Sequence, residues 1–228
     1  VAAHVVKIVN NCTDTLNIIL RNLKVDAGTS KEDAMNISGT GDVTLELDGK
    51  NELISGSSTY DSAHGSLAGL HSGHLDGTLT LTDADKDGGS LTAKGGYSKD
   101  SSSAGSDGIR AKDLSIIDTS ITAVGGDVGG SSYRGGTGLS AEVLNMTGSS
   151  LSATGGSVNN SIDDSSLGGY GLSIGNYDGL KSNISDSHIS AIGGNNSGSG
   201  KKVVGGMGAS IIGTAADSYL IDHVTLLV

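Results

Sequence analysis

The sequence of 228 residues contains no proline, tryptophan or phenylalanine, and its only aromatic side chains are six tyrosines. Because large aromatic residues dominate most cores, a core here has to be built in thin layers from Val, Ile, Leu and Ala. Glutamate is scarce as well, since 21 of the 25 acidic residues are aspartate and 4 are glutamate. Aspartate favours turns whereas glutamate favours helices, so we expect a chain rich in turns and poor in helix.

Cysteine, positive charge and long apolar runs are also in short supply. Cys12 is the single cysteine, which excludes an intrachain disulfide. No stretch reaches the ~18 apolar residues of a membrane-spanning helix, so we expect no membrane insertion. With 14 basic and 25 acidic residues the net charge is −11. This charge disfavours nucleic acid as a partner, because its phosphates need Lys and Arg.

Glycine is abundant, with 38 residues, and part of it recurs as a Gly-Gly doublet that closes a short phrase. LSIIDTSITAVGG covers 114–126, LNMTGSSLSATGG covers 144–156 and SNISDSHISAIGG covers 182–194. The doublets begin at Gly95, Gly125, Gly155 and Gly193, in steps of 30, 30 and 38 residues. A phrase that returns at this interval is typical of a stacked repeat.

Each repeat contains three short segments with strand character. The first opens with Gly (GLHS at 69–72, GIRA at 108–111, GLSA at 138–141), the second alternates (VTLEL at 43–47, LTLT at 79–82), and the third ends at the doublet. Alternation at period two places one face in a core and the other in water. The sequence therefore predicts a single all-β domain over 1–228, a single-stranded right-handed parallel β-helix (solenoid) of about seven coils.

Corresponding positions in the repeats predict which side chains stack. Ile121, Leu151 and Ile189 are expected to form one inward ladder, and Ile116 and Met146 belong to a second. We expect tight inner corners at the alanines before the doublets, which are Ala93, Ala123, Ala153 and Ala191. The doublets themselves are expected to allow positive φ and close backbone approach.

Variable Gly/Ser-rich insertions follow the doublets at 97–106, 127–137, 157–170 and 195–207. We expect them to project as loops on one side of the rod, and such insertions often form the binding face of a solenoid. The chain begins without Met and ends in the apolar segment 219–228, which lacks a polar cap. This pattern predicts a fragment of a larger surface or secreted protein, with further domains of the same chain at either end.

Two stretches carry a resemblance to a known family: DAMNISGTGDVTLELDGKNELISGSSTYDSAHGSLAGLHSGHLDGTLTLTDADKDGGSLTAKGG at 33–96 and SDGIRAKDLSIIDTSITAVGG at 106–126. They resemble the repeats of β-helical "carbohydrate-binding domain-containing" surface or secreted proteins of gut bacteria, and the resemblance covers residues 16–194. It implies the β-helix fold and a secreted or cell-surface location. We expect a non-catalytic, adhesin-like module that binds glycans or host-surface protein.

The segment Asp83-Ala-Asp85-Lys-Asp87-Gly88 has the D-x-D-x-D-G pattern of a calcium loop. Three carboxylates at alternate positions can converge on one hard cation, which makes Asp83, Asp85 and Asp87 candidate Ca²⁺ ligands. An EF-hand needs a further acid where this chain has Lys94. A plain acidic turn between two strands explains the same residues.

Four tyrosines lie in or beside the insertions and are candidate glycan-binding residues: Tyr97, Tyr133, Tyr170 and Tyr177. An exposed aromatic ring can stack on a sugar face while nearby Asn, Asp and Ser bind its hydroxyls. The alternative is that each ring covers its own loop against the rod, which amphipathic tyrosine does routinely.

Two other function classes stay open. A polysaccharide lyase or glycoside hydrolase on a pectate-lyase-like β-helix could use the Asp163-Asp164 pair or Arg110 as a base, and convergence of Asp85, Asp87, Arg110 and Asp118 in one groove would favour it. His71 and His74, with His64 near them in sequence, could form a metal cluster. The alternative is that they are separate surface histidines. The third class is a purely structural stalk whose loops bind nothing. We expect no enzymatic activity.

Overall fold

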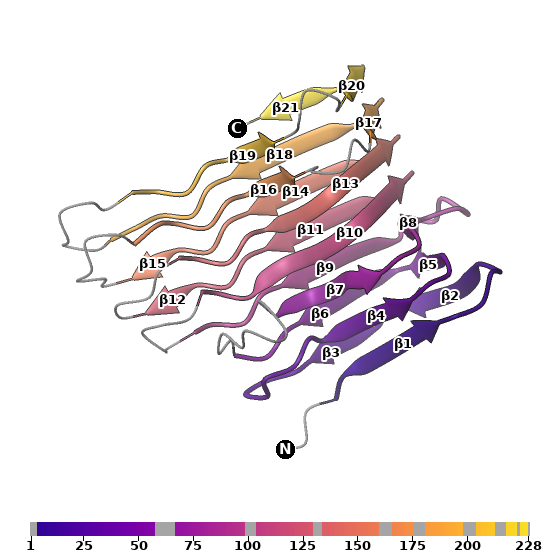
Figure 1. Ribbon diagram of the computed structural model, residues 1–228, viewed down its shortest axis with the longest axis horizontal. Helices are drawn as coiled ribbons and strands as arrows, with labels where there is room; N and C mark the ends of the chain where they lie inside the picture. The colour runs from indigo at the N-terminus through magenta and orange to yellow at the C-terminus, as the bar shows by residue number, and fades with distance from the viewer. Residues whose placement is uncertain are drawn as a thin grey trace.

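The computed structural model describes residues 4–57, 67–98, 104–129, 134–159, 166–175, 181–197, 204–212, 218–222 and 224–227. Within these ranges every regular element is a β-strand, and the strands form two long sheets and one short one (Figure 1). All strand pairings between them are parallel. The molecule is therefore all-β, as predicted, and its long parallel sheets are compatible with a β-helix.

The larger sheet has 12 strands, which lie in front in Figure 1. They are β1 (Val6–Asn10), β2 (Leu16–Arg21), β4 (Met35–Gly39), β5 (Val43–Asp48), β7 (Ala68–Leu75), β8 (Leu79–Thr82), β10 (Asp107–Ile117), β13 (Leu139–Thr147), β16 (Leu172–Gly175), β17 (Lys181–Ser185), β19 (Ala209–Ile212) and β20 (Ser218–Asp222). The main path through this sheet runs β1-β4-β7-β10-β13-β16-β19, so each strand pairs with the equivalent strand of the next repeat.

The second sheet has seven strands in the order β21-β18-β14-β11-β9-β6-β3. They are β3 (Lys24–Asp26), β6 (Lys50–Ile54), β9 (Ser90–Lys94), β11 (Ser120–Val124), β14 (Ser150–Thr154), β18 (His188–Ile192) and β21 (Thr225–Leu227). The short sheet pairs β12 (Val128–Gly129) with β15 (Val158–Asn159). Isolated parallel bridges such as Arg134–Leu167 continue the same alignment between the insertions.

The predicted ladders are confirmed by the strand register. Ile121 pairs with Leu151, and Leu151 pairs with Ile189, so the three form one column in the second sheet. Ile116 pairs with Met146 in the first sheet. The alanines before the doublets, Ala93, Ala123, Ala153 and Ala191, also form one column and are fully buried. The expectation that they occupy corners is wrong, because each lies inside a strand of the second sheet.

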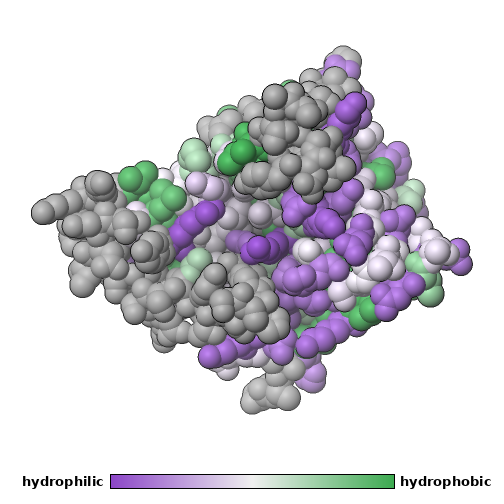
Figure 2. Space-filling view, in the orientation of Figure 1, coloured by the Kyte–Doolittle hydropathy of each residue, from purple (hydrophilic) through white to green (hydrophobic). Residues whose placement is uncertain are grey.

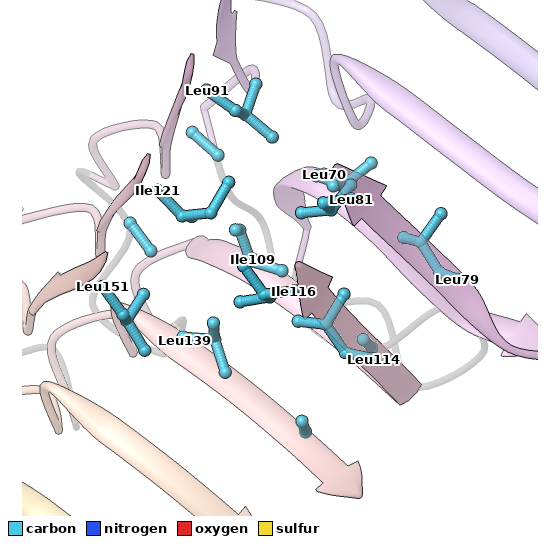
Figure 3. Packing of buried hydrophobic residues seen from close by; sticks show 14 of the residues in the cluster. Leu70, Leu79, Leu81, Leu91, Ile109, Leu114, Ile116, Ile121, Leu139 and Leu151 are labelled. Atoms are coloured by element: carbon cyan, nitrogen blue, oxygen red, sulfur yellow. The ribbon is translucent and has the colours of Figure 1, made fainter. Parts of the chain in front are cut away.

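The core lies between the two long sheets and consists of aliphatic side chains in layers. Figure 3 shows Leu91, Ile121 and Leu151 of the second sheet facing Ile109 and Leu139 of the first. All five are buried, at 1% exposure or less. Because each layer repeats the layer beside it, the core needs no large aromatic residue to fill it.

One strand prediction differs from the structure. GIRA at 108–111 and LSI at 114–116 were expected as separate short strands, but both lie in the single 11-residue strand β10. The backbone between them stays extended, because β10 pairs with β7 over its first part and with β8 over its second. The equivalent segments of the next repeat form the continuous strand β13 in the same way.

The Gly-Gly doublets stack backbone against backbone. A Cβ atom added at Gly126 would lie 2.1 Å from the carbonyl oxygen of Gly96, and one at Gly156 would lie 2.0 Å from that of Gly126. The expected close approach is thus confirmed. The expected positive φ is wrong: among the described glycines φ is positive only at Gly28, Gly39, Gly49, Gly88 and Gly148, none of which belongs to the doublets that begin at Gly95, Gly125, Gly155 and Gly193. Steric room, rather than backbone conformation, requires glycine at the doublets.

Replacing Gly126 with Ala should therefore destabilise the protein by about 1–3 kcal/mol, because the new methyl group meets a neighbouring carbonyl that cannot rotate away. Gly205→Ala is a matched control, since the nearest atom to its Cβ would be 3.6 Å away. Urea unfolding of both variants measures the difference. Equal free energies of unfolding for the two variants would contradict the stacking argument.

An ionic cluster lies on the outer face of the second sheet. Glu52 accepts hydrogen bonds from Lys24 and Lys94, each with Nζ 2.8 Å from a carboxylate oxygen. These two bonds lower the pKa of Glu52 from 4.5 to about 2. The stabilisation is present above pH 4.5 and is lost as the pH falls toward about 2.

Glu52→Gln should therefore lose less stability than the wild type when the pH falls from about 6 to about 2.5. The side chain is 26% exposed, so we expect a difference of no more than about 1 kcal/mol. Glu142→Gln, which removes an exposed glutamate of β13, serves as the control and should follow the wild-type curve. Denaturant titrations at both pH values provide the comparison, and parallel losses in the wild type and Glu52→Gln would refute the expectation.

Candidate binding pocket

A column of polar side chains crosses the outer face of the first sheet. The register aligns one residue from each of six neighbouring strands: Asn36, His71, Arg110, Ser140, Ser173 and Ser210. Neighbouring parallel strands lie ~4.8 Å apart, so the column offers a polar group at each step. Figure 2 shows hydrophilic residues gathered across the middle and right of this face. The preceding residues in three of the strands, Leu70, Ile109 and Leu139, are buried, because strand side chains alternate between faces.

A hollow of about 360 Å³ lies over this column. Arg110, Ser140 and Ser173 line it from the sheet, whereas Arg134, Thr137 and Tyr170 line it from the segments that follow the Gly-Gly doublets. Such a volume lies within the range of small-molecule sites. We call this hollow the arginine pocket.

Arg134 is held in place on two sides. Its guanidinium carbon lies 4.0 Å from the centre of the Tyr170 ring, which is a cation–π contact. Its Nη2 donates a hydrogen bond to Thr137 Oγ1 at 3.2 Å. Its Nε is buried and has no hydrogen-bond partner in the described part of the chain. The guanidinium of Arg134 is therefore held in position while its Nε–H lacks a described acceptor.

Asp107 is the acidic residue of the arginine pocket, and it is buried, with 7% exposure. Its Oδ1 accepts a 2.8 Å hydrogen bond from the backbone N–H of Thr137, and its Oδ2 lies 3.8 Å from Nη1 of Arg110. Burial raises the pKa of Asp107, and the Thr137 hydrogen bond and the nearby arginines offset only part of this effect. At 3.8 Å the carboxyl and Arg110 form an ion pair that is longer than a hydrogen bond.

His71 and Asp33 form a buried pair at the neighbouring position of the column. His71 Nδ1 lies 3.0 Å from Asp33 Oδ2, which also accepts a 2.8 Å hydrogen bond from Asn36 Nδ2, while Asp33 Oδ1 accepts one of 2.7 Å from the Ala68 N–H. Burial alone would raise the pKa of Asp33, but these partners outweigh it and lower the pKa below its ordinary value. The pair connects the chain before β4 to β7 and orients the His71 ring.

The D-x-D-x-D-G segment forms a turn between β8 and β9, as the plain-turn alternative predicts, and it also gathers carboxylates. Oxygen atoms of Glu46, Asp83 and Asp85 lie within 4.8 Å of one another, and this is the only such group of three found in the described residues. We call the turn, together with Glu46 of β5, the acidic turn. Asp83 is 4% exposed. Its Oδ2 accepts hydrogen bonds from the N–H groups of Gly88 and Gly89 at 3.0 and 2.9 Å, and its Oδ1 is buried without a described partner.

Asp87 lies outside that group of three, although it was expected to join Asp83 and Asp85. The pKa of Asp87 is raised, first by desolvation and then by the carboxylates of Asp85, Asp48 and Asp83. Its charge is therefore disfavoured beside the acidic turn.

A second hollow of about 610 Å³ follows the corner between the two sheets. Asp118, Gly148 and Asp186 stand at equivalent corner positions with φ values of 51°, 61° and 47°. Aspartate and glycine tolerate this left-handed conformation better than other residues do. The Ser and Thr residues that follow each of them make the wall of this hollow polar.

The structure separates several predicted site residues. Tyr170 lines the arginine pocket, whereas Tyr97 is 44% exposed and its hydroxyl lies over Gly129. Arg110 lies in the arginine pocket and Asp118 in the corner hollow, while Asp85 belongs to the acidic turn. The rings of His71 and His74 are 5.3 Å apart. The remaining candidates lie outside the described residues: Tyr133, Tyr177, His64, Asp163 and Asp164.

Two members of these sites were not among the predicted ligands. Arg134 joins the arginine pocket from the insertion 127–137, in which only Tyr133 was a predicted site residue. Glu46 reaches the acidic turn because it pairs with Thr82, next to Asp83. Aligning VTLEL at 43–47 with LTLT at 79–82 would have found Glu46, since the two segments occupy the same place in successive repeats.

No helix among the described residues is long and apolar enough to cross a membrane. Comparison of the chain with protein-family models, with curated proteins and with solved structures found no match.

Proposed function

We propose that this chain is a non-catalytic, adhesin-like glycan-binding module of a secreted or cell-surface protein. The observation that carries the proposal is the arginine pocket, a hollow of about 360 Å³ in which polar side chains from neighbouring strands meet the insertion segments. Its volume suits one or two sugar units. Sugars need donors and acceptors at several points, and Ser140, Ser173 and Thr137 offer both.

We further propose that the two long sheets belong to a single-stranded right-handed parallel β-helix of about seven coils. The order β1-β4-β7-β10-β13-β16-β19 supports this, because one strand from each repeat follows the next along one sheet. The second sheet and the bridges between insertions repeat the same step. On such a rod the arginine pocket lies on one side, where the first sheet meets the insertion segments.

The tyrosines have different roles in this proposal. Tyr170 supports Arg134 through one ring face, so it shapes the pocket. Tyr97 presents an exposed ring near the next insertion and offers a stacking surface for a sugar. Tyr133 and Tyr177 stay predicted contacts of the same kind.

Binding is proposed over catalysis because the basic candidate lies apart from the acidic ones. Arg110 lines the arginine pocket, whereas Asp118 lines the corner hollow together with Asp83 of the acidic turn. General acid–base chemistry needs its groups within hydrogen-bond reach of one substrate bond.

We also propose that the acidic turn takes Ca²⁺, with Glu46, Asp83 and Asp85 as ligands and Asp87 nearby. The buried, unpartnered Oδ1 of Asp83 supports this, because a buried carboxylate oxygen needs a donor or a cation. Oxygen is the ligand atom that Ca²⁺ prefers.

A glycan-array screen tests the function. The wild type should bind at least one glycan, and Tyr170→Ala should weaken that binding about tenfold or more, because Arg134 loses its support. Thr122→Ala, on the outer face of the second sheet, is the control and should bind like the wild type. Host-surface proteins are screened in parallel. If the wild type binds no glycan, with or without Ca²⁺, the proposed glycan-binding function is wrong.

The calcium site is tested by thermal unfolding with Ca²⁺ or a chelator. Calcium should raise the midpoint of the wild type, because a ligand that binds only the folded state stabilises it. Asp83→Asn and Asp85→Asn should remove this rise, whereas Asp14→Asn, which removes an exposed aspartate outside the acidic turn, should keep it. A wild-type midpoint that does not respond to Ca²⁺ would count against the site.

A further inference from the structure

We propose that the arginine pocket binds a tetrahedral oxyanion ester, a sulfate or phosphate group carried by a sugar. This inference rests on the proposed glycan-binding function and names the chemical class of the glycan. It starts from the distribution of arginine. The chain has three arginines and a net charge of −11, yet two of the three, Arg110 and Arg134, line this one hollow. The third, Arg21, lies elsewhere on the first sheet, where it pairs with Asp48.

Arg134 is arranged to receive an anion. The Tyr170 ring and Thr137 Oγ1 hold its guanidinium from two sides, so little conformational entropy is lost when a ligand binds. Its buried Nε has no described hydrogen-bond partner. A buried N–H without an acceptor is costly, and a small shift of the guanidinium toward an anionic oxygen would satisfy it through a charge-assisted bond.

The positive charge of Arg110 is only weakly paired with a carboxylate. Its described ionic partner is Asp107, whose Oδ2 lies 3.8 Å from Nη1, well beyond the ~2.7–2.9 Å of a charge-assisted hydrogen bond. The other oxygen of Asp107 is already occupied by the N–H of Thr137. Two arginines line the pocket, whereas Asp107 is the one acidic residue among its described lining. The pocket therefore keeps a positive charge that its own carboxylate does not cancel.

The directions of the donors favour a tetrahedral group over a planar one. Arg110, Ser140 and Ser173 rise from three neighbouring strands of the sheet, whereas Arg134 enters from an insertion segment. A carboxylate presents two oxygens in one plane, and a single guanidinium fork satisfies them. A sulfate or phosphate ester presents three terminal oxygens in different directions, which matches donors on several sides.

The charge of the whole chain limits the ligand further. A net charge of −11 repels a long polyanion, so the favourable field is confined to the pocket. An isolated ester on an otherwise neutral sugar gains the local contacts without much of that repulsion. We therefore expect a sparsely modified glycan rather than a densely charged polymer.

The test compares four sugars that differ at one carbon: galactose, galactose 6-sulfate, galactose 6-phosphate and galacturonic acid. Calorimetry on the full chain should give at least about tenfold tighter binding for an ester than for galactose or galacturonic acid. The two ester arms separate sulfate from phosphate. Inorganic sulfate and phosphate, followed by NMR, probe the pocket without any sugar.

Arg134→Gln and Arg110→Gln should each weaken ester binding by about 10- to 100-fold. Arg21→Gln is the control, because it removes an exposed arginine outside the pocket, and it should leave binding unchanged. Arg110→Lys keeps the charge but loses the fork, so it should bind with intermediate affinity. Thermal unfolding of each variant identifies any that fail to fold.

The inference is overturned if neither esters nor inorganic anions bind, if galacturonic acid binds as tightly as the esters, or if folded Arg134→Gln binds like the wild type. Glycan binding that persists unchanged in Arg134→Gln would overturn this inference and leave the proposed function standing. Binding of inorganic sulfate or phosphate at Arg134 by a chain that binds no glycan would instead support the oxyanion site and overturn the glycan function.

Discussion

The register between neighbouring repeats is the constraint on which this molecule depends. In a parallel sheet, a slip by one residue exchanges the two faces of a strand. Such a slip in β10 would bring Arg110 into the core and Ile109 out of it. The doublets oppose slippage, because only glycine leaves room for the neighbouring carbonyl. A Cβ added at Gly126 would lie 2.1 Å from the carbonyl oxygen of Gly96. The apolar ladders and the polar column therefore persist or fail together.

Much of this register could be predicted from the sequence, because equivalent positions of successive repeats can be aligned directly. Four equivalent segments have a polar residue at their third position: His71 in GLHS (69–72), Arg110 in GIRA (108–111), Ser140 in GLSA (138–141) and Ser173 in GLSI (171–174). The structure pairs these residues between neighbouring strands. The ladder of Ile121, Leu151 and Ile189 followed from the same alignment. The strand boundaries were harder to predict, since an extended backbone through Lys112 and Asp113 joins two expected strands without any signal in the pattern.

The candidate sites were less predictable, because they depend on contacts between different kinds of segment. Arg134 reaches the polar column only after the chain turns at the Gly125 doublet and comes back toward β13. No spacing rule in the sequence relates it to Arg110 or Tyr170. Asp33 and His71 meet across 38 residues. His71 was a candidate only through His74 and His64, and nothing in the sequence linked it to Asp33. The positive φ expected at the doublets was wrong for a similar reason: crowding by the adjacent repeat, invisible in one repeat alone, also demands glycine.

The two charged sites show how a regular scaffold concentrates chemistry. Parallel strands place equivalent residues ~4.8 Å apart, so a single substitution in one repeat changes one step of a column and leaves the ladders intact. Arg110 stands where the next repeats have Ser140 and Ser173, and Glu46 stands where the next has Thr82. Each charge is inserted into a row of small polar groups and is completed by a turn or insertion nearby. A site of this kind arises without any change in the apolar core, because the side chains of the column lie on the face opposite the core. The same logic locates the arginine pocket at the point where the column meets the insertion segments, since donors come there from both the sheet and the insertions.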